Sequence, residues 1–239
     1  MASDRAYHGG VGETFAARAD AAGLNALHDR PAVLNLIGDV QGLTIADLGC
    51  GPGHYIVELV ARGAHVMGVE GSAELVAQAR SRVSPPTKVV HHNLEEPLDF
   101  LGESSQDGVL CALVIHHLSN RRRFLREIHR VLRPGGWLIV STTHPTADWG
   151  RFGGSYFDER WVTRPLDDQH AIEYQLLTMS TLVNDCLDAG FVLERMVEPQ
   201  PSPRLAELDP GRYAELQAAP IFLALRLRAQ PRPTLKGNP

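Results

Sequence analysis

The stretch Ile45-Ala-Asp-Leu-Gly-Cys-Gly-Pro-Gly-His54 decides the fold, because an apolar run leads directly into a loop with glycine at every second position. Glycine lets the backbone turn tightly and lets a ligand approach bare N–H groups. The helical segment that follows, from about residue 54 to 62, points its positive end at such a ligand and favours an anionic group there. A second apolar run then ends on Glu70, 23 residues after Asp47. The pattern predicts a βαβ unit that binds a nucleoside.

Two carboxylates in this unit restrict the choice of ligand. Glu70, at the tip of the second strand, is placed to accept hydrogen bonds from ribose hydroxyls. Asp47, beside the glycine loop, would repel a pyrophosphate, whereas it suits a positively charged group such as the ammonium of an amino acid. A ligand with an adenosine, an amino-acid carboxylate, an ammonium and a sulfonium satisfies all of these requirements. We therefore expect S-adenosylmethionine (SAM) rather than a dinucleotide.

Four segments carry a resemblance to a known family. Ala46-Asp-Leu-Gly-Cys-Gly-Pro-Gly53 resembles the first motif of the class I SAM-dependent methyltransferases, and three further segments follow in that family's order. Residues 89–98 resemble the third-strand segment whose end holds adenine. Residues 107–118 resemble the fourth strand and the loop under the donor. Residues 124–140 resemble a helix, a Pro-Gly-Gly turn and the fifth strand. The resemblance covers roughly residues 30–200. Within the class, the chain is more similar to the small-molecule branch, which includes quinone C-methyltransferases and bacterial natural-product enzymes.

The resemblance implies a donor site at the carboxyl ends of the first strands. The polar residue and the following amide that hold adenine are Asn93 and Leu94 here, although the family often has aspartate where Asn93 stands. The backbone of Cys111 is expected beneath the methionyl group, and Tyr7 belongs to an N-terminal segment that folds over the donor. Together the expected donor-binding residues are Asp47, Gly49, Cys50, Gly51, Gly53, Glu70, Gly71, Asn93, Leu94, Cys111 and Tyr7.

Apolar runs of strand length alternate with segments of helical periodicity, and this alternation predicts an α/β fold. We expect a Rossmann-like, seven-stranded, mostly parallel sheet with helices on both faces and an antiparallel last strand. Residues 109–115 form a continuous apolar run, which is typical of a strand buried on both faces. Alternation of apolar and polar residues in 223–228 indicates a half-exposed strand at an antiparallel edge. The expected strands are 43–48, 64–70, 87–92, 108–115, 136–142, 191–197 and 221–228.

The chain is expected to form one methyltransferase domain over residues 1–239. Residues 1–42 are interpreted as a helical lid, with helical character from about 11 to 38 that is interrupted near Gly23 and at Pro31. The SAM-binding core follows in 43–142, and 179–229 complete the sheet before a proline-rich tail in 230–239. The segment 143–178 is rich in glycine, aromatic and polar residues, and we interpret it as a cap over the acceptor. Its candidate acceptor-pocket residues are Asp148, Trp149 and Tyr156.

Composition agrees with a globular enzyme. The 239 residues are 44% hydrophobic and 21% charged, which is typical of a soluble protein. A net charge of −5 provides no general attraction to nucleic acid, and the basic cluster Arg121-Arg-Arg123 is interpreted as a solvated helix face. No apolar run approaches the length of a membrane span and no signal segment is recognisable, so the cytoplasm is the expected location. The scattered Cys50, Cys111 and Cys186 indicate neither a disulfide framework nor a zinc site.

Candidate bases follow the fourth and fifth strands. Methyl transfer from a sulfonium depends mainly on alignment, and it needs a base only when the acceptor loses a proton. His116 and His117 close the fourth strand and His144 closes the fifth, and the alternative for each is a structural hydrogen bond. The pairs His91-His92 and His116-His117 do not predict a metal site, because adjacent residues on a strand point to opposite faces. No metal is therefore expected.

The expected function is transfer of a methyl group from SAM to oxygen, carbon or nitrogen of a small organic molecule, a class that includes secondary metabolites. One alternative is a SAM-binding protein of this fold that uses the ligand structurally or in a rearrangement and transfers no methyl group. A nicotinamide-dependent oxidoreductase fits less well, because of the loop spacing and Asp47. A methyltransferase for RNA or protein is disfavoured by the net acidity and by the lack of an Asn/Asp-Pro-Pro-Tyr motif after the fourth strand. The sequence carries no signal for oligomeric state.

Overall fold

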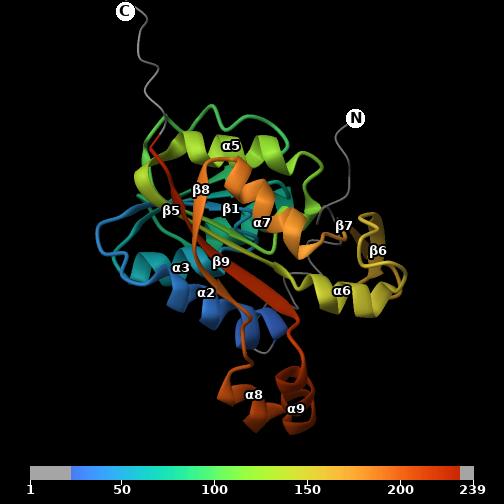
Figure 1. The fold of residues 1–239 in the computed structure, drawn as a ribbon. Helices are drawn as coiled ribbons and strands as arrows, with labels where there is room; N and C mark the ends of the chain where they lie inside the picture. The colour runs from blue at the N-terminus through green and yellow to red at the C-terminus, as the bar shows by residue number, and fades with distance from the viewer. Residues whose placement is uncertain (1–22, 232–239) are drawn as a thin grey trace, which may run out of the picture.

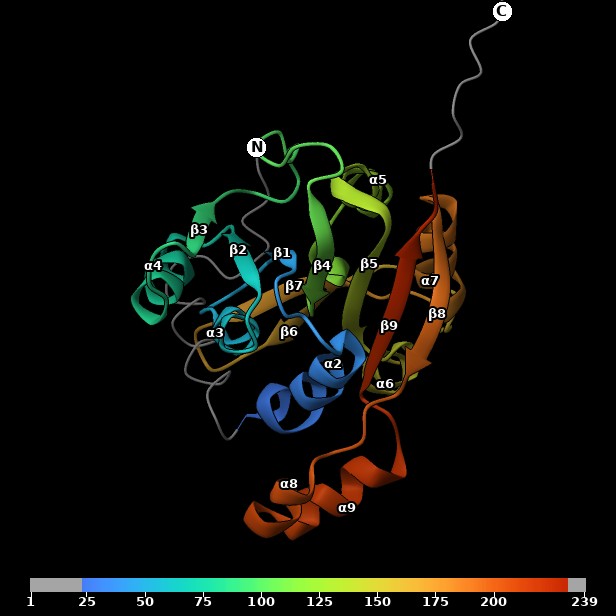
Figure 2. The ribbon, with the colours of Figure 1, turned by 90° about the vertical axis from the view of Figure 1, so that its left-hand side faces the viewer.

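The computed structural model describes residues 23–231, in which a seven-stranded sheet lies between two layers of helices (Figures 1 and 2). The spatial order is β3-β2-β1-β4-β5-β9-β8, and β9 is antiparallel to both of its neighbours. The predicted fold class is confirmed, and each predicted strand has a counterpart. The strands of this sheet are β1 (Thr44–Leu48), β2 (His65–Glu70), β3 (Lys88–His91), β4 (Gln106–Ala112), β5 (Leu132–Thr143), β8 (Phe191–Val197) and β9 (Phe222–Ala229).

Helices cover both faces of the sheet because each presents one apolar stripe to it. Val33 of α2 (Arg30–Ile37), Ile56 of α3 (His54–Ala61) and Val76 of α4 (Ala73–Arg82) belong to the apolar cluster on one face. Ile128 of α5 (Arg121–Val131) and Leu182 of α7 (Met179–Asp188) belong to the cluster on the other. This arrangement leaves the carboxyl ends of the parallel strands as the edge where a ligand can approach the sheet.

Strand β9 is not the edge strand that its alternating pattern predicted. It lies between β5 and β8, and most of its residues are buried. The two arginines that produce the alternation have partners within the protein: Glu194 of β8 forms ion pairs with both Arg226 and Arg228. The Arg226 guanidinium also lies 5.8 Å from the centre of the Trp137 ring. Polar residues on this strand therefore reflect local pairing and not an exposed edge, so the edge prediction was wrong.

The helical N-terminal region lies only partly within the described residues. η1 (Asn25–Asp29) is a π-helix that continues directly into α2. Pro31 is the second residue of α2, next to the point where the π-helix changes to an α-helix, and the helical chain is not broken there. The predicted interruption at Pro31 was therefore wrong. Tyr7, the predicted helical residues before Gly23 and most of the predicted tail lie outside the described residues.

The segment predicted as a cap contains a helix and a two-stranded hairpin. The helix is α6 (Pro145–Phe152), which follows β5 directly, and the hairpin pairs β6 (Trp161–Pro165) with β7 (Ala171–Gln175). The hairpin meets η2 (Ile115–His117), a short turn after β4, where His117 Nδ1 donates to the carbonyl oxygen of Glu173 over 2.9 Å. The segment therefore lies beside the carboxyl ends of β4 and β5.

Two short helices between β8 and β9 have no counterpart in the sequence-based prediction. α8 (Pro203–Leu208) and α9 (Pro210–Ala218) project from one end of the sheet in both views (Figures 1 and 2). Leu205 and Leu216 pack with Leu27 of η1 in a small apolar cluster, and the Ser202 amide donates to the Leu27 carbonyl oxygen at 2.8 Å. This contact ties the helical pair to the N-terminal side of α2.

Candidate active site

The loop between β1 and α3 has the backbone geometry that only glycine tolerates well. Gly49, Gly51 and Gly53 have φ angles of 77°, 55° and 90°, all in the left-handed region. A Cβ atom on Gly49 would lie 2.3 Å from Cγ2 of Val114, a residue just beyond β4. Glycine at this position therefore allows both the turn and the close approach of the loop to the end of β4.

The amides of this loop are not bare, which corrects one part of the sequence-based interpretation. The Gly49 and Cys50 amides donate to the Val69 carbonyl oxygen at 2.7 and 3.0 Å, and the Gly53 amide donates to the Cys50 carbonyl oxygen at 3.0 Å. The Gly51 amide donates to Oε2 of Glu70 at 2.9 Å. These bonds hold the loop against β2. The first-turn amides of α3, which lack intrahelical partners, are the donors at this edge that suit an anion.

Asp47 is a buried carboxylate with an unused acceptor. Its side chain is 1% exposed, and Oδ2 has no hydrogen-bond partner among the described residues. Burial, with a further contribution from the charge of Glu70, raises the pKa of Asp47 to about 8. A buried acceptor without a partner is uncommon in folded proteins and costs free energy. A cation bound beside Asp47 would remove that cost.

Glu70 is held at the tip of β2 by two backbone amides. Oε2 accepts from the Gly51 amide at 2.9 Å, and Oε1 accepts from the Ser72 amide at 2.8 Å. Ser72 in turn caps α4 through the Leu75 amide. The carboxylate is therefore fixed in orientation between the glycine loop and the start of α4.

The residues expected around adenine gather at the β2–β3 side of the carboxyl edge. Leu94 is buried and Asn93 is exposed, with its Oδ1 accepting from the Glu95 amide at 3.0 Å. His91 Nε2 donates to the Gly71 carbonyl oxygen at 2.9 Å, which joins the ends of β2 and β3. A Cβ atom on Gly71 would meet only the His92 carbonyl oxygen, at 3.7 Å. The edge is thus open at Gly71 and Asn93.

The cysteines of the predicted donor site contribute no exposed thiol. Cys50 and Cys111 are both buried, and burial raises the pKa of each thiol above its usual value. Cys111 lies in β4, opposite Val140 of β5. Two residues later, Leu113 adopts a φ of 59°, which is strained for a branched side chain. Such strain at the carboxyl edge marks Leu113 as a functional candidate that no sequence signal indicated.

The three candidate bases each have a hydrogen-bond partner. His116 Nδ1 lies 2.8 Å from Thr142 Oγ1, and His117 Nδ1 donates to the Glu173 carbonyl oxygen. His144 caps α6 by accepting from the Thr146 amide at 3.2 Å. Burial lowers the pKa of all three, to about 4 for His117. At neutral pH these imidazoles are therefore uncharged.

The candidate acceptor-pocket residues also have partners within the cap. Asp148 is buried and accepts from Tyr174 Oη at 2.8 Å and from Thr143 Oγ1 at 2.5 Å. Trp149 Nε1 donates to the Gly154 carbonyl oxygen, and Tyr156 Oη accepts from the Met179 amide, both at 2.8 Å. A cavity of about 10 Å³ lies under the cap, which is room for a single water. Its lining includes His116, Thr142, Thr143, Asp148, Gln175 and Leu182.

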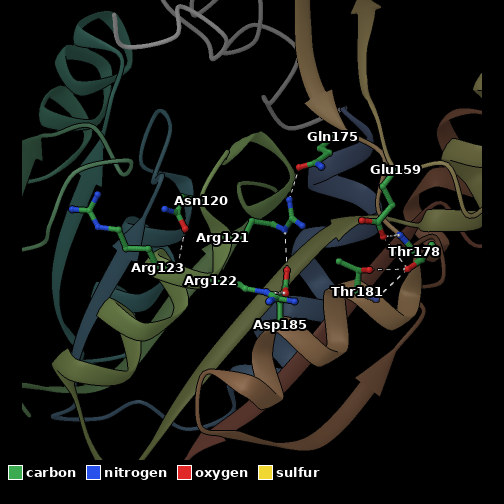
Figure 3. Close-up of polar contacts among 9 residues, drawn as sticks. All are labelled: Asn120, Arg121, Arg122, Arg123, Glu159, Gln175, Thr178, Thr181 and Asp185. Carbon is green, nitrogen blue, oxygen red and sulfur yellow. Dashed lines mark hydrogen bonds and ion pairs between the residues drawn. The ribbon is translucent and has the colours of Figure 1, made fainter.

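The basic cluster at the start of α5 is not the solvated face that the sequence predicted. Figure 3 shows Arg121 and Arg122 converging on Asp185 of α7, with Nε–carboxylate distances of 3.2 and 2.7 Å. Asp185 is buried, and the Arg121 side chain is only 10% exposed because it also donates to Gln175 of β7. The cluster therefore joins α5, α7 and the cap hairpin, and the prediction of a solvated face was wrong for Arg121.

A second polar group in the same view fastens the cap to α7. Oε1 of Glu159 accepts from the amide and the hydroxyl of Thr178, both at 3.0 Å, and Thr178 caps the helix through the Thr181 amide (Figure 3).

Among residues 23–231 no group of three or more metal-ligating side chains is found. Within the same range, no helix combines the length and the apolar character that crossing a bilayer requires.

Comparison with known proteins shows what this fold and sequence are similar to. A family described as "Methyltransferase domain" matches residues 46–140. A probable S-adenosylmethionine-dependent methyltransferase of Mycobacterium tuberculosis is 34% identical over 184 residues, which are 76% of this chain and 60% of the relative. The N-demethylindolmycin N-methyltransferase of Streptomyces griseus is 35% identical over 106 residues, 42% of this chain and 44% of the relative. The chain thus spans less than two thirds of either relative.

A solved structure of a methyltransferase is also similar to this chain. The S-adenosylmethionine-dependent methyltransferase from Mesorhizobium loti has 27% sequence identity and a TM-score of 0.73, over 83% of this chain and 96% of that protein.

Proposed function

The chain belongs to the class I SAM-dependent methyltransferases, and on that premise we propose that it transfers a methyl group from SAM to oxygen, carbon or nitrogen of a small organic acceptor. The observation that carries the proposal is the buried Asp47, whose Oδ2 lacks a partner among the described residues beside a left-handed glycine loop. A cationic amino-acid group fits this position, whereas a pyrophosphate would meet an unfavourable charge.

At the edge formed by the carboxyl ends of the parallel strands, different residues would bind different parts of SAM. Asp47 would pair with the ammonium, and the first-turn amides of α3 would hold the amino-acid carboxylate. The Gly51 and Ser72 amides fix the orientation of Glu70, and its carboxylate would accept hydrogen bonds from the ribose hydroxyls. Gly71, Asn93 and Leu94 would border adenine. The strained Leu113 and the backbone of Cys111 would lie under the methionyl group.

SAM, when bound, supplies a methyl group on a positively charged sulfur, so the chain's own task is to position the acceptor and exclude water. The ordered cap over the ends of β4 and β5 suits this task. For an acceptor that loses a proton, His144, His117 and His116 remain our candidate bases, because an uncharged imidazole can accept one. His144 Nε2 lies 3.1 Å from Glu198, which would stabilise the imidazolium that forms. The relative named for N-methylation of demethylindolmycin supports a small acceptor.

Calorimetric titration with SAM and S-adenosylhomocysteine tests the donor site. We expect Glu70→Ala to weaken binding of both compounds by about 1–3 kcal/mol, because it removes a charged hydrogen-bond acceptor from the ribose. Glu70→Gln retains one acceptor oxygen and is expected to lose less. Glu96→Ala, a substitution of an exposed glutamate on the same edge, is the matched control and should leave both affinities unchanged.

The same preparation separates methyl transfer from the alternative of a SAM-binding protein without that activity. Incubation of wild-type protein, SAM and a panel of small phenols, amines and acidic carbon compounds is expected to yield S-adenosylhomocysteine with at least one acceptor. Tight SAM binding without S-adenosylhomocysteine formation across the panel would favour the alternative. Failure of wild-type protein to bind either compound would contradict the proposed donor site.

A further inference from the structure

The π-helix η1 carries two adjacent buried ionisable side chains with partners in different parts of the fold. His28 Nε2 donates to the Pro199 carbonyl oxygen over 2.7 Å, in the segment before α8. Oδ2 of Asp29 accepts from Tyr55 Oη of α3 and from Ser141 Oγ of β5, each at 3.1 Å. π-Helical turns are rare and frequently occur at functional sites. Each side chain also has one buried atom without a hydrogen-bond partner among the described residues, Nδ1 of His28 and Oδ1 of Asp29.

Among the described residues, one oxygen of Asp29 accepts two hydrogen bonds and the other accepts none. The side chain is 1% exposed, and Oδ1 has no partner among residues 23–231. A carboxylate that served only to fasten η1 to the sheet would be expected to satisfy both oxygens, because an unpaired buried acceptor opposes folding. The same condition holds for Oδ2 of Asp47. The two side chains are thus alike in burial and in having one unused oxygen.

The strand register places Asp29 on the same side of the sheet as Asp47. Asp47 of β1 lies opposite Leu110 of β4, which lies opposite Ile139 of β5. Laterally paired residues share a face, and Ser141 is two residues beyond Ile139, so the Ser141 side chain is on the face of Asp47. Ser141 is also nearer the carboxyl end of its strand. The hydrogen bond from Ser141 therefore brings Asp29 to the edge where Asp47 lies.

Tyr55 connects the two carboxylates. It is in the first turn of α3, two residues after Gly53, and its hydroxyl donates to Asp29. Burial raises the pKa of Tyr55 well above its usual value, and the charges of Asp29 and Asp47 add to that effect. Tyr55 therefore lies within electrostatic reach of both carboxylates, beside the first-turn amides that suit an amino-acid carboxylate.

We propose that Asp29 is a second donor-binding carboxylate, whose Oδ1 pairs with the ammonium of the donor's amino-acid end while Tyr55 and Ser141 fix the orientation of the carboxyl group. The proposal rests on the proposed function, since it assigns a further residue to the same donor. A cation is the group that two buried carboxylates on one edge would attract most strongly. Burial raises the pKa of Asp29 to about 7, although the two hydroxyl hydrogen bonds lower it, so a nearby ammonium would restore the charged form.

Two ligands that differ only at the amino-acid end test the role of Asp29. S-adenosylhomocysteine carries the ammonium, whereas 5′-methylthioadenosine has the same nucleoside and sulfur without it. In calorimetric titrations of the full chain, Asp29→Asn is expected to weaken S-adenosylhomocysteine binding about tenfold and to leave 5′-methylthioadenosine binding unchanged. Tyr55→Phe retains the carboxylate but loses one orienting bond, so a smaller, equally selective loss is expected.

The controls separate this proposal from a structural role and from failure of the proposed function. Asp39→Asn changes an exposed carboxylate in the same way and should alter neither affinity. Equal losses for both ligands in Asp29→Asn would show a general effect on the fold and would overturn the proposal, as would unchanged S-adenosylhomocysteine binding. If Asp29→Asn does not fold, the selective loss in Tyr55→Phe decides the question. Wild-type protein that binds neither ligand would instead contradict the donor site itself.

Discussion

Asp47→Asn is expected to weaken S-adenosylhomocysteine binding by about 2–5 kcal/mol, the range found when one partner of a buried, hydrogen-bonded charge pair is removed. Asparagine preserves the size of the side chain, so the loss reports the missing charge. Its NH₂ group would also place a donor near the ammonium. Titration calorimetry measures the change directly, and 5′-methylthioadenosine, which lacks the ammonium, is expected to bind the variant about as well as wild type.

The same carboxylate predicts how the affinity depends on pH. The pKa of Asp47 in the free protein is about 8, so at pH 7 the carboxyl group is mostly protonated and must lose its proton to pair with an ammonium. Affinity for S-adenosylhomocysteine is therefore expected to rise as pH increases from about 6 to 7.5, by up to about tenfold per pH unit for each proton released. Asp47→Asn should remove this proton's contribution to the slope. An unchanged slope in the variant would contradict the assignment.

Asp47 also affects the stability of the protein without ligand. Its pKa is raised from 3.8 to about 8 by folding, so the folded state holds the proton more tightly than the unfolded state. The contribution of this group to stability is fully present below about pH 4 and is lost as pH rises toward 8. Asp47→Asn is accordingly expected to melt at a higher temperature than wild type at about pH 8 while it binds the ligand more weakly. Asp39→Asn serves as the control for both measurements.

Asp185→Ala is expected to lower the free energy of unfolding by about 3 kcal/mol. The substitution removes the ion-pair partner of the Arg121 guanidinium, which is 10% exposed. That charge then remains buried, with a hydrogen bond to Gln175 and the Glu159 carboxylate within electrostatic reach. Loss of one partner of a buried ion pair costs about 3–5 kcal/mol. The lower end applies here because the second partner, Arg122, has a side chain that is 64% exposed and its pair with Asp185 contributes little.

Urea denaturation of matched variants measures this effect. Asp188→Ala, on the same helix but exposed, should change the free energy of unfolding by less than about 0.5 kcal/mol. Arg121→Met together with Asp185→Ala removes both charges, so the double variant is expected to be more stable than Asp185→Ala alone. A loss below about 1 kcal/mol for Asp185→Ala would show that the Arg121 charge finds solvent or another partner.

The parallel part of the sheet could be predicted because its evidence is local. A strand buried on both faces needs a continuous apolar run, and residues 109–115 show one that corresponds to β4 and the turn after it. The loop 49–53 could also be predicted from the sequence, since left-handed φ angles at three positions require glycine at each. The position of β9 could not be predicted from the sequence. Arg226 and Arg228 produce the same alternation of apolar and polar residues whether water or Glu194 pairs with their charges.

The donor-binding half of the candidate site could be predicted from the sequence. The prediction missed other residues of the site for a physical reason. Asp47 and Glu70 lie near the ends of two strands that meet at one edge, so their proximity follows from the strand pattern. Asp29 meets Ser141 across 112 positions of sequence, and no local pattern encodes such a contact. The strained φ of Leu113 is equally invisible, since leucine carries no preference for the left-handed region. Pairing of the loop amides with Val69 likewise depends on tertiary packing.

The position of β9 also determines the order in which the sheet can be completed during synthesis. β8 is made before β9, yet within the described sheet its only neighbour is β9. When residues up to 197 have emerged from the ribosome, the five parallel strands from β3 to β5 can already pair, while β8 has a hydrogen-bonding edge and nothing to bind. Exposed strand edges promote aggregation. In the nascent protein, the edges of β5 and β8 that will face β9 therefore both stay open until this single late strand enters between them and pairs with both.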